Sequence, residues 1–206
     1  MVERHDQTNH DDEDAILVQQ ALESQGDLRP FESLVERDQA KVLANCRYLT
    51  GSADDAQDLA QEVFVKAYFG LGRFRGESRF GTWVKRIKVN HCLNFLKRRK
   101  EKGHVDVNDP VHEDHEAMQV EPVVEARSEA ASRRHRIAAT LERLPENLRV
   151  PLVMCDLDEM AYQDIADQLG LGLSAVKMRI KRGREEFRRV YADLQEPMEP
   201  LRRKGH

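Results

Sequence analysis

Apolar residues recur at helical spacing wherever this chain has a regular pattern, and that periodicity restricts its fold more than any other feature. The clearest stripe has an apolar residue every three or four positions: Ala56, Leu59, Ala60, Val63, Phe64 and Ala67. Ser52 and Asp55 resemble a capping box at the start of this helix. No segment keeps the alternation of a strand, so the sequence predicts an all-α fold.

Further helices are predicted on both sides of this stripe. Asp14 is a candidate cap for a short helix, and a longer one is expected over Phe31–Leu49. A fourth helix should begin near Ser78 and end in a basic tract. A stretch rich in acidic residues and proline follows, before helical periodicity returns near Ser132. We therefore predict two helical domains joined by a flexible acidic linker, with domains at 14–102 and 132–190 and the linker at 103–131.

Charge is segregated along the chain, although the net charge is only −4. Residues 11–14 are all acidic, the region from Arg73 to Lys102 is strongly basic, 106–129 is acidic again, and 177–189 is basic. Two basic surfaces joined by an acidic segment indicate nucleic-acid partners more clearly than the total charge does.

Several functional classes are disfavoured by what the sequence lacks. The 206 residues contain no apolar run long enough for a membrane span, and the polar N-terminus has no signal-peptide core, so we expect a cytoplasmic protein. The three cysteines are scattered and are expected to be reduced and mostly buried. Neither His112 with His115 nor His91 with Cys92 has a recognised metal-ligand spacing. We expect no catalytic residues, no metal and no cofactor.

The segment from Tyr162 to Lys181 has the pattern of a helix-turn-helix. Ala166 supplies the small residue where the helices touch and Gly170 the turn, with branched apolar residues at Ile165, Leu169, Val176 and Ile180. The second helix then presents Lys177, Met178, Lys181 and Arg182 outward, where a recognition helix meets the major groove. The alternative is a helical hairpin with a solvated basic face, in which Tyr162 only packs.

The segment from Asp54 to Arg99 combines a polar-faced helix, a loop rich in glycine and arginine, and a helix that mixes Trp83 with many cations. Exposed rings stack on unpaired bases while cations follow the backbone, so this mixture suits single-stranded nucleic acid. The alternative, which does not exclude binding, is that Phe80, Trp83 and Ile87 form the core of a helical bundle.

These two segments, in this order around a linker, resemble the extracytoplasmic function (ECF) sigma factors of bacterial RNA polymerase. Asp54–Arg99 resembles their second conserved domain and Leu144–Arg188 their fourth. The resemblance implies a polymerase-docking surface at Asp58, Leu59, Gln61, Glu62, Val63 and Phe64. It implies recognition and melting of the minus-ten element by Phe74, Arg75, Arg79, Trp83, Arg86 and Asn90. It implies recognition of the minus-thirty-five element by Tyr162, Lys177, Met178, Lys181 and Arg182.

The resemblance further implies core RNA polymerase and promoter DNA as partners, an anti-sigma factor as an inhibitor, and a role in stress response. Ser174 and Ala175 replace a Gly-Thr pair that often opens the recognition helix, and Met178, Lys181 and Gly183 are also atypical, so the promoter sequence is left open. Two other functions remain: a stand-alone helix-turn-helix regulator that binds operators without polymerase, and an adaptor that only docks helices.

Overall fold

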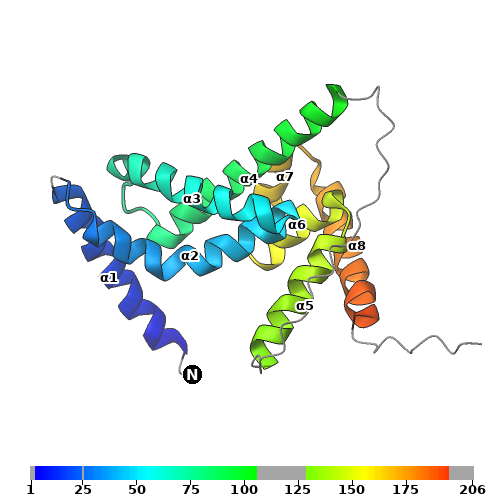
Figure 1. The fold of residues 1–206 in the computed structure, drawn as a ribbon, viewed down its shortest axis with the longest axis horizontal. Helices are drawn as coiled ribbons and strands as arrows, with labels where there is room; N and C mark the ends of the chain where they lie inside the picture. The colour runs from blue at the N-terminus through cyan, green and yellow to red at the C-terminus, as the bar shows by residue number, and fades with distance from the viewer. Residues whose placement is uncertain (1–2, 25, 106–128, 195–206) are drawn as a thin grey trace, which may run out of the picture. The chain divides into compact units, whose positions relative to one another are not determined.

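The computed structural model describes residues 3–24, 26–105 and 129–194, and these contain α-helices and one 3₁₀ turn but no strand (Figure 1). The prediction of an all-α fold is thus confirmed. The chain divides into two compact units, one from Met1 to His112 and the other from Glu113 to His206. The first unit contains α1 (Glu3–Glu23), α2 (Arg29–Thr50), α3 (Ala53–Gly70), a 3₁₀ turn η1 (Leu71–Arg73) and α4 (Phe80–Val105).

The core of the first unit lies among α2, α3 and α4, which pack against one another. All six residues of the predicted α3 stripe are buried. Half of the predicted capping box is present, because the Ser52 side chain accepts a hydrogen bond from the Asp55 backbone N–H at 3.3 Å, whereas the Ser52 backbone N–H donates to Thr50 Oγ1 at 3.3 Å. Gly51, with a φ of 71°, ends α2 in the left-handed conformation that glycine adopts without strain. The short α2–α3 connection therefore fixes two antiparallel neighbours.

The first helix begins earlier than the sequence predicted. Asp14 was taken as its cap, but α1 starts at Glu3 and Asp14 lies inside it, so that prediction was wrong. The Asp14 carboxylate instead pairs with Arg37 of α2 at 2.9 Å, and Glu13 contacts the same guanidinium at 2.9 Å. Asp14 preceded the first apolar positions, which is where a cap is expected, but its side chain serves an interhelical ion pair.

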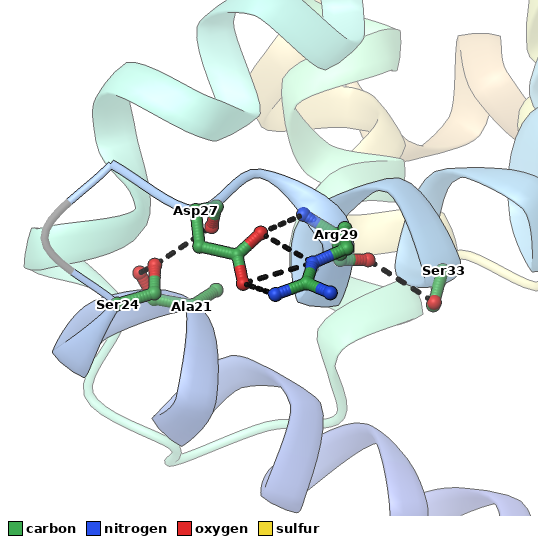
Figure 2. Close-up of polar contacts among 5 residues, drawn as sticks. All are labelled: Ala21, Ser24, Asp27, Arg29 and Ser33. Atoms are coloured by element: carbon green, nitrogen blue, oxygen red, sulfur yellow. Dashed lines mark hydrogen bonds and ion pairs between the residues drawn. The ribbon is translucent and has the colours of Figure 1, made fainter.

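The turn between α1 and α2 is held by short-range polar contacts (Figure 2). Ser24 Oγ donates to the carbonyl oxygens of Ala21 and Asp27, at 3.1 and 2.8 Å. The Asp27 carboxylate accepts from the Arg29 side chain at 2.7–3.0 Å and from the Arg29 backbone N–H at 3.0 Å. These hydrogen bonds, the side-chain ones first, lower the pKa of Asp27 to about 2. The Asp27 carboxylate therefore stays ionised, and keeps its hydrogen bonds to Arg29, at acidic pH values above about 2.

The second unit contains α5 (Glu129–Arg143), α6 (Glu146–Asp156), α7 (Tyr162–Leu169) and α8 (Leu173–Asp193). Helix α8 packs on each of the other three, and the buried residues include Leu141, Val153, Met154 and Ile180. Pro145 directly precedes α6, as its fixed φ favours. The buried Arg149 donates from Nη1 to the Leu144 carbonyl at 3.1 Å, which ties α6 to the end of α5.

The predicted acidic linker falls mostly on residues 106–128, which lie outside the described residues. At its two ends the helices extend beyond the expected borders. Helix α4 continues to Val105 rather than to residue 102, and α5 begins at Glu129 rather than near Ser132.

Candidate nucleic-acid interface

The helix-turn-helix predicted in the second unit is present as α7, a short turn and α8. Gly170 has a φ of 62°, and Leu171 N–H bonds to the Ala166 carbonyl at 2.9 Å, so the turn closes on the end of α7. Ala166 and Val176 are buried, as the motif requires where its two helices meet. The hairpin alternative has the same backbone pattern, so the distinction between the two rests on the outer face of α8.

The outer face of α8 carries the predicted recognition residues. Lys177, Lys181 and Arg182 are exposed, and Met178 is 49% exposed. Lys177 and Lys181 are four residues apart and lie one above the other on successive turns, and Arg182 directly follows Lys181. Tyr162 differs from them, because it is half-buried at the start of α7 and its side chain reaches Cys155. Packing therefore accounts for at least part of the Tyr162 side chain.

Two contacts hold the recognition helix against α6. Gly183 is buried, and a Cβ placed there would lie 3.1 Å from the Leu148 carbonyl oxygen and 3.4 Å from Leu152 Cβ. One residue further, Arg184 donates to both carboxylate oxygens of Asp156, at 3.0 and 2.6 Å. The Arg184 hydrogen bond lowers the pKa of Asp156. Helix α8 thus lies close to α6 because Gly183 has no side chain, and the ion pair between Arg184 and Asp156 links the two helices.

An aromatic cluster lies at the start of α4 in the first unit. Ring centroids are 5.1 Å apart for Phe74 and Trp83, 6.2 Å for Phe74 and Phe80, and 5.9 Å for Phe80 and Trp83. Phe80 is buried, whereas Phe74 and Trp83 are half-buried. The sequence left open whether these rings form core or binding surface. Phe80 belongs to the core, and the other two rings contact it while remaining partly exposed.

The predicted polar residues of this region lie in the loop before α4 and along α4 itself. Arg75 and Arg79 are exposed in the loop before α4, where Arg75 Nη1 lies 3.9 Å from Glu77 Oε1. Arg86 and Asn90 are exposed on α4 and lie one turn apart, so they share a face of the helix. The segment thus combines exposed cations and an amide with partly open rings, the combination that stacking and phosphate contact require.

The six predicted docking residues of α3 separate into two groups. Asp58, Gln61 and Glu62 are exposed, while Leu59, Val63 and Phe64 are buried against the rest of the first unit. Only the first group offers a surface. The second group supports the helix from beneath, because its side chains form the apolar stripe that anchors α3.

A groove of about 570 Å³, which was not predicted from the sequence, runs between α3 and α4. Asp58 and Glu62 line one wall, and Asn90, Asn94 and Arg98 line the other. Across it, His91 Nε2 lies 2.7 Å from Glu62 Oε2. Burial lowers the pKa of His91, against the opposing effect of Glu62. The groove joins the predicted docking helix to the predicted minus-ten helix, a contact between segments that local sequence patterns cannot reveal.

The exposed side of α3 continues beyond Glu62 as an apolar surface. Val65 is 54% exposed and Phe69 is 80% exposed. Phe69 packs edge-on against Tyr68 with ring centroids 5.5 Å apart. No function was predicted for this part of the helix, because the exposure of Phe69 depends on the packing of α3.

Two other features are absent from the described residues. These residues contain no group of three or more His, Cys, Asp or Glu side chains placed to hold a metal ion. Among them, no helix is both long enough and apolar enough to cross a membrane.

A helix-turn-helix unit and a second helical unit, each with a cationic surface, indicate a DNA-binding protein. The sequence matches the family Sigma-70 region 2 over residues 34–102 and the family Sigma-70 region 4 over residues 134–187. The RNA polymerase sigma-H factor of Pseudomonas aeruginosa is 35% identical over 190 residues, which cover 89% of this chain and 96% of the relative. The chain therefore belongs to the sigma-70 family, and within it to the ECF sigma factors.

Further relatives agree with this assignment. The ECF RNA polymerase sigma-E factor of Escherichia coli is 35% identical over 177 residues, covering 84% of this chain and 91% of the relative. The structure of CnrH in complex with the cytosolic domain of CnrY matches with a TM-score of 0.52 at 25% identity, over 89% of this chain and 99% of that one. The sigma factor RpoE from Bartonella quintana, solved with the anti-sigma factor NepR, has a TM-score of 0.56 at 17% identity, covers 81% and 98%, and supports the fold.

Proposed function

We propose that this chain directs promoter-specific transcription initiation by binding core RNA polymerase with the first unit and promoter DNA with both units. The observation that carries this proposal is the separation of exposed charge on the described helices. One side of α3 is acidic, whereas the start of α4 and the outer side of α8 are basic. A chain that only bound DNA would have no use for an exposed acidic helix beside its DNA-binding surface.

Polymerase docking is assigned to Asp58, Gln61 and Glu62, the exposed members of the α3 set. Leu59, Val63 and Phe64 act indirectly, by fixing α3 on the core. An acidic helix face fits a basic surface on the partner, where complementary charge speeds association and orients the complex.

The minus-ten element is assigned to Phe74, Arg75, Arg79, Trp83, Arg86 and Asn90. The arginines follow the backbone of the separated strand, and the open portions of Phe74 and Trp83 stack on an unpaired base. Capture of unstacked bases shifts the melting equilibrium without hydrolysis, since the protein binds the open state in preference to the duplex. We therefore propose that the chain is a regulator and not an enzyme.

The minus-thirty-five element is assigned to Lys177, Met178, Lys181 and Arg182 on α8. Lysine and arginine contact phosphates or guanine edges, and Met178 adds only apolar contact. Tyr162 lies at the N-terminus of α7, where the exposed part of its side chain can contact the DNA backbone.

The two DNA contacts cooperate because polymerase holds them at a fixed spacing. Two modest contacts on one frame gain affinity through effective concentration, so neither unit has to bind tightly alone. We propose the domain borders 14–102 and 132–190 and an acidic linker at 103–131, which DNA repels and which a basic channel of polymerase accommodates. The sigma factor RpoE was solved with the anti-sigma factor NepR, and CnrH with the cytosolic domain of CnrY; we propose that an inhibitor of the anti-sigma class binds this chain.

Run-off transcription with purified core polymerase and a pooled promoter library tests this function. Addition of the chain should produce discrete start sites that core polymerase alone does not produce. Gel filtration with core polymerase separates the remaining alternatives. A stand-alone regulator would elute apart from polymerase, and an adaptor would co-elute without conferring start-site selection; either result contradicts the proposal.

A further inference from the structure

Two cysteines far apart in the sequence meet in the core of the first unit. Cys46 on α2 and Cys92 on α4 are 46 positions apart, yet their sulfur atoms lie 3.7 Å from each other, with the Cys92 thiol donating to Cys46 Sγ. Both side chains have an exposed fraction of 0%. The odd number and the scattered positions of the cysteines had argued against a disulfide framework, so this proximity was not predicted.

The two sulfurs are in contact but are farther apart than in a disulfide. A bond requires them to approach to about 2.05 Å, so its formation needs side-chain rotation and a small shift of one helix. The two helices already pack directly against each other, so no rearrangement of the fold is needed. Cys155 belongs to the other unit, where it lies 3.6 Å from Arg184 Nη2 and has no cysteine neighbour among the described residues.

We propose that Cys46 and Cys92 form an oxidation site that a small peroxide converts from a dithiol to a disulfide. One thiol attacks hydrogen peroxide, giving a sulfenic acid (Cys–SOH) and one water molecule. The second thiol then displaces the hydroxyl group, so that the S–S bond forms and a second water molecule leaves. Two thiols are oxidised by two electrons and one peroxide is reduced to two waters.

The disulfide links α2 to α4 and encloses α3 together with the loop from Phe74 to Arg79. A cross-link over a segment of this length removes much of the freedom of the unfolded chain, so the oxidised unit should melt at a higher temperature, by a rise on the order of 5–10 °C. Burial has two kinetic effects. It slows the first oxidation, since peroxide must enter the core, and it protects the finished bond from external thiols such as glutathione.

The experiment uses the full-length protein with Cys155→Ser, so that the third thiol cannot form linked dimers. The folded, reduced protein is treated with hydrogen peroxide, excess oxidant is removed, and intact mass and non-reduced tryptic peptides are measured. Loss of two hydrogens, together with a peptide pair joined through Cys46 and Cys92, is the expected result. Melting is then recorded with and without dithiothreitol. The expected rise in Tm is reversed by dithiothreitol, provided that the reductant is given time to enter the core.

Cys46→Ala and Cys92→Ala in the same background are the controls. Each is compared before and after oxidation with itself, so a change in basal stability does not affect the result, and neither should gain a reversible rise in Tm. The proposal is overturned if both thiols remain titratable after peroxide treatment of the folded protein, or if the linked peptides form only in urea. A linked protein with an unchanged or lower Tm overturns the proposed stabilisation.

Discussion

Replacing Gly183 tests whether close packing of α8 on α6 positions the recognition helix. A Cβ at residue 183 would lie 3.1 Å from the Leu148 carbonyl oxygen, nearer than ordinary van der Waals contact, and the obstacle is backbone that cannot rotate away. Overpacking of this kind costs about 1–3 kcal/mol, whereas replacing a mid-helix glycine with alanine gains about 1 kcal/mol of helix propensity. Gly183→Ala should therefore be nearly neutral, and Gly183→Val should destabilise the second unit by about 2 kcal/mol.

Hydrogen exchange followed by mass spectrometry measures this effect within the full chain. A loss of about 2 kcal/mol corresponds to roughly thirtyfold faster exchange of the protected amides in α6 and α8. Peptides from α3 and α4 should exchange as before, because they belong to the other compact unit. Gly172→Ser is the matched control: a Cβ there meets nothing within 4 Å, and serine is a favoured N-cap. If the α8 amides of the Gly183→Val variant exchange as slowly as those of the unmodified chain, the packing argument is wrong.

Three further predictions concern charge. Arg182→Ala should weaken promoter binding by roughly 1–3 kcal/mol if the guanidinium contacts a base. Arg188→Ala, further along α8, should change promoter binding little. Equal losses of binding for the two variants in a filter-binding assay would exclude Arg182 from base recognition. Glu62→Arg should abolish co-elution with core polymerase, while Glu36→Arg, an equal charge change on α2, should leave it intact; retained co-elution of the Glu62 variant excludes that residue from docking. Asp156→Asn should lower the Tm of the second unit at neutral pH. Since Arg184 lowers the pKa of Asp156, the stabilisation is present above the ordinary aspartate pKa and is lost as the pH falls through the lowered value, so the two proteins should converge in acid; a constant difference in Tm would contradict this.

Local features of the fold were predictable because they depend on neighbouring residues. The Ser52 cap, the α3 stripe and the Gly170 turn each follow from spacings of three or four positions, and each is present. The prediction that Asp14 caps the first helix was wrong because a side chain that can cap a helix can also pair with a distant arginine. The choice depends on tertiary packing, which local propensity does not contain.

The candidate site was predictable in its chemistry but only partly in its geometry. Family resemblance gave the residues of α3 as one set, but it did not separate exposed Glu62 from buried Val63 next to it. The approach of His91 to Glu62, and of Cys92 to Cys46, joins residues from different helices. Adjacent positions on a helix point about 100° apart, so His91 and Cys92 face different neighbours and do not form one metal site.

The shared groove between α3 and α4 has a consequence for genetics. Because Glu62 and Asn90 line the same 570 Å³ space, a substitution on either wall alters the surroundings of the other. Screens for altered promoter preference should therefore recover alleles that also change holoenzyme assembly, and second-site suppressors of an Asn90 allele should arise on α3. By contrast, alleles on the outer face of α8 should segregate as pure promoter mutants, since no docking residue is assigned to that helix.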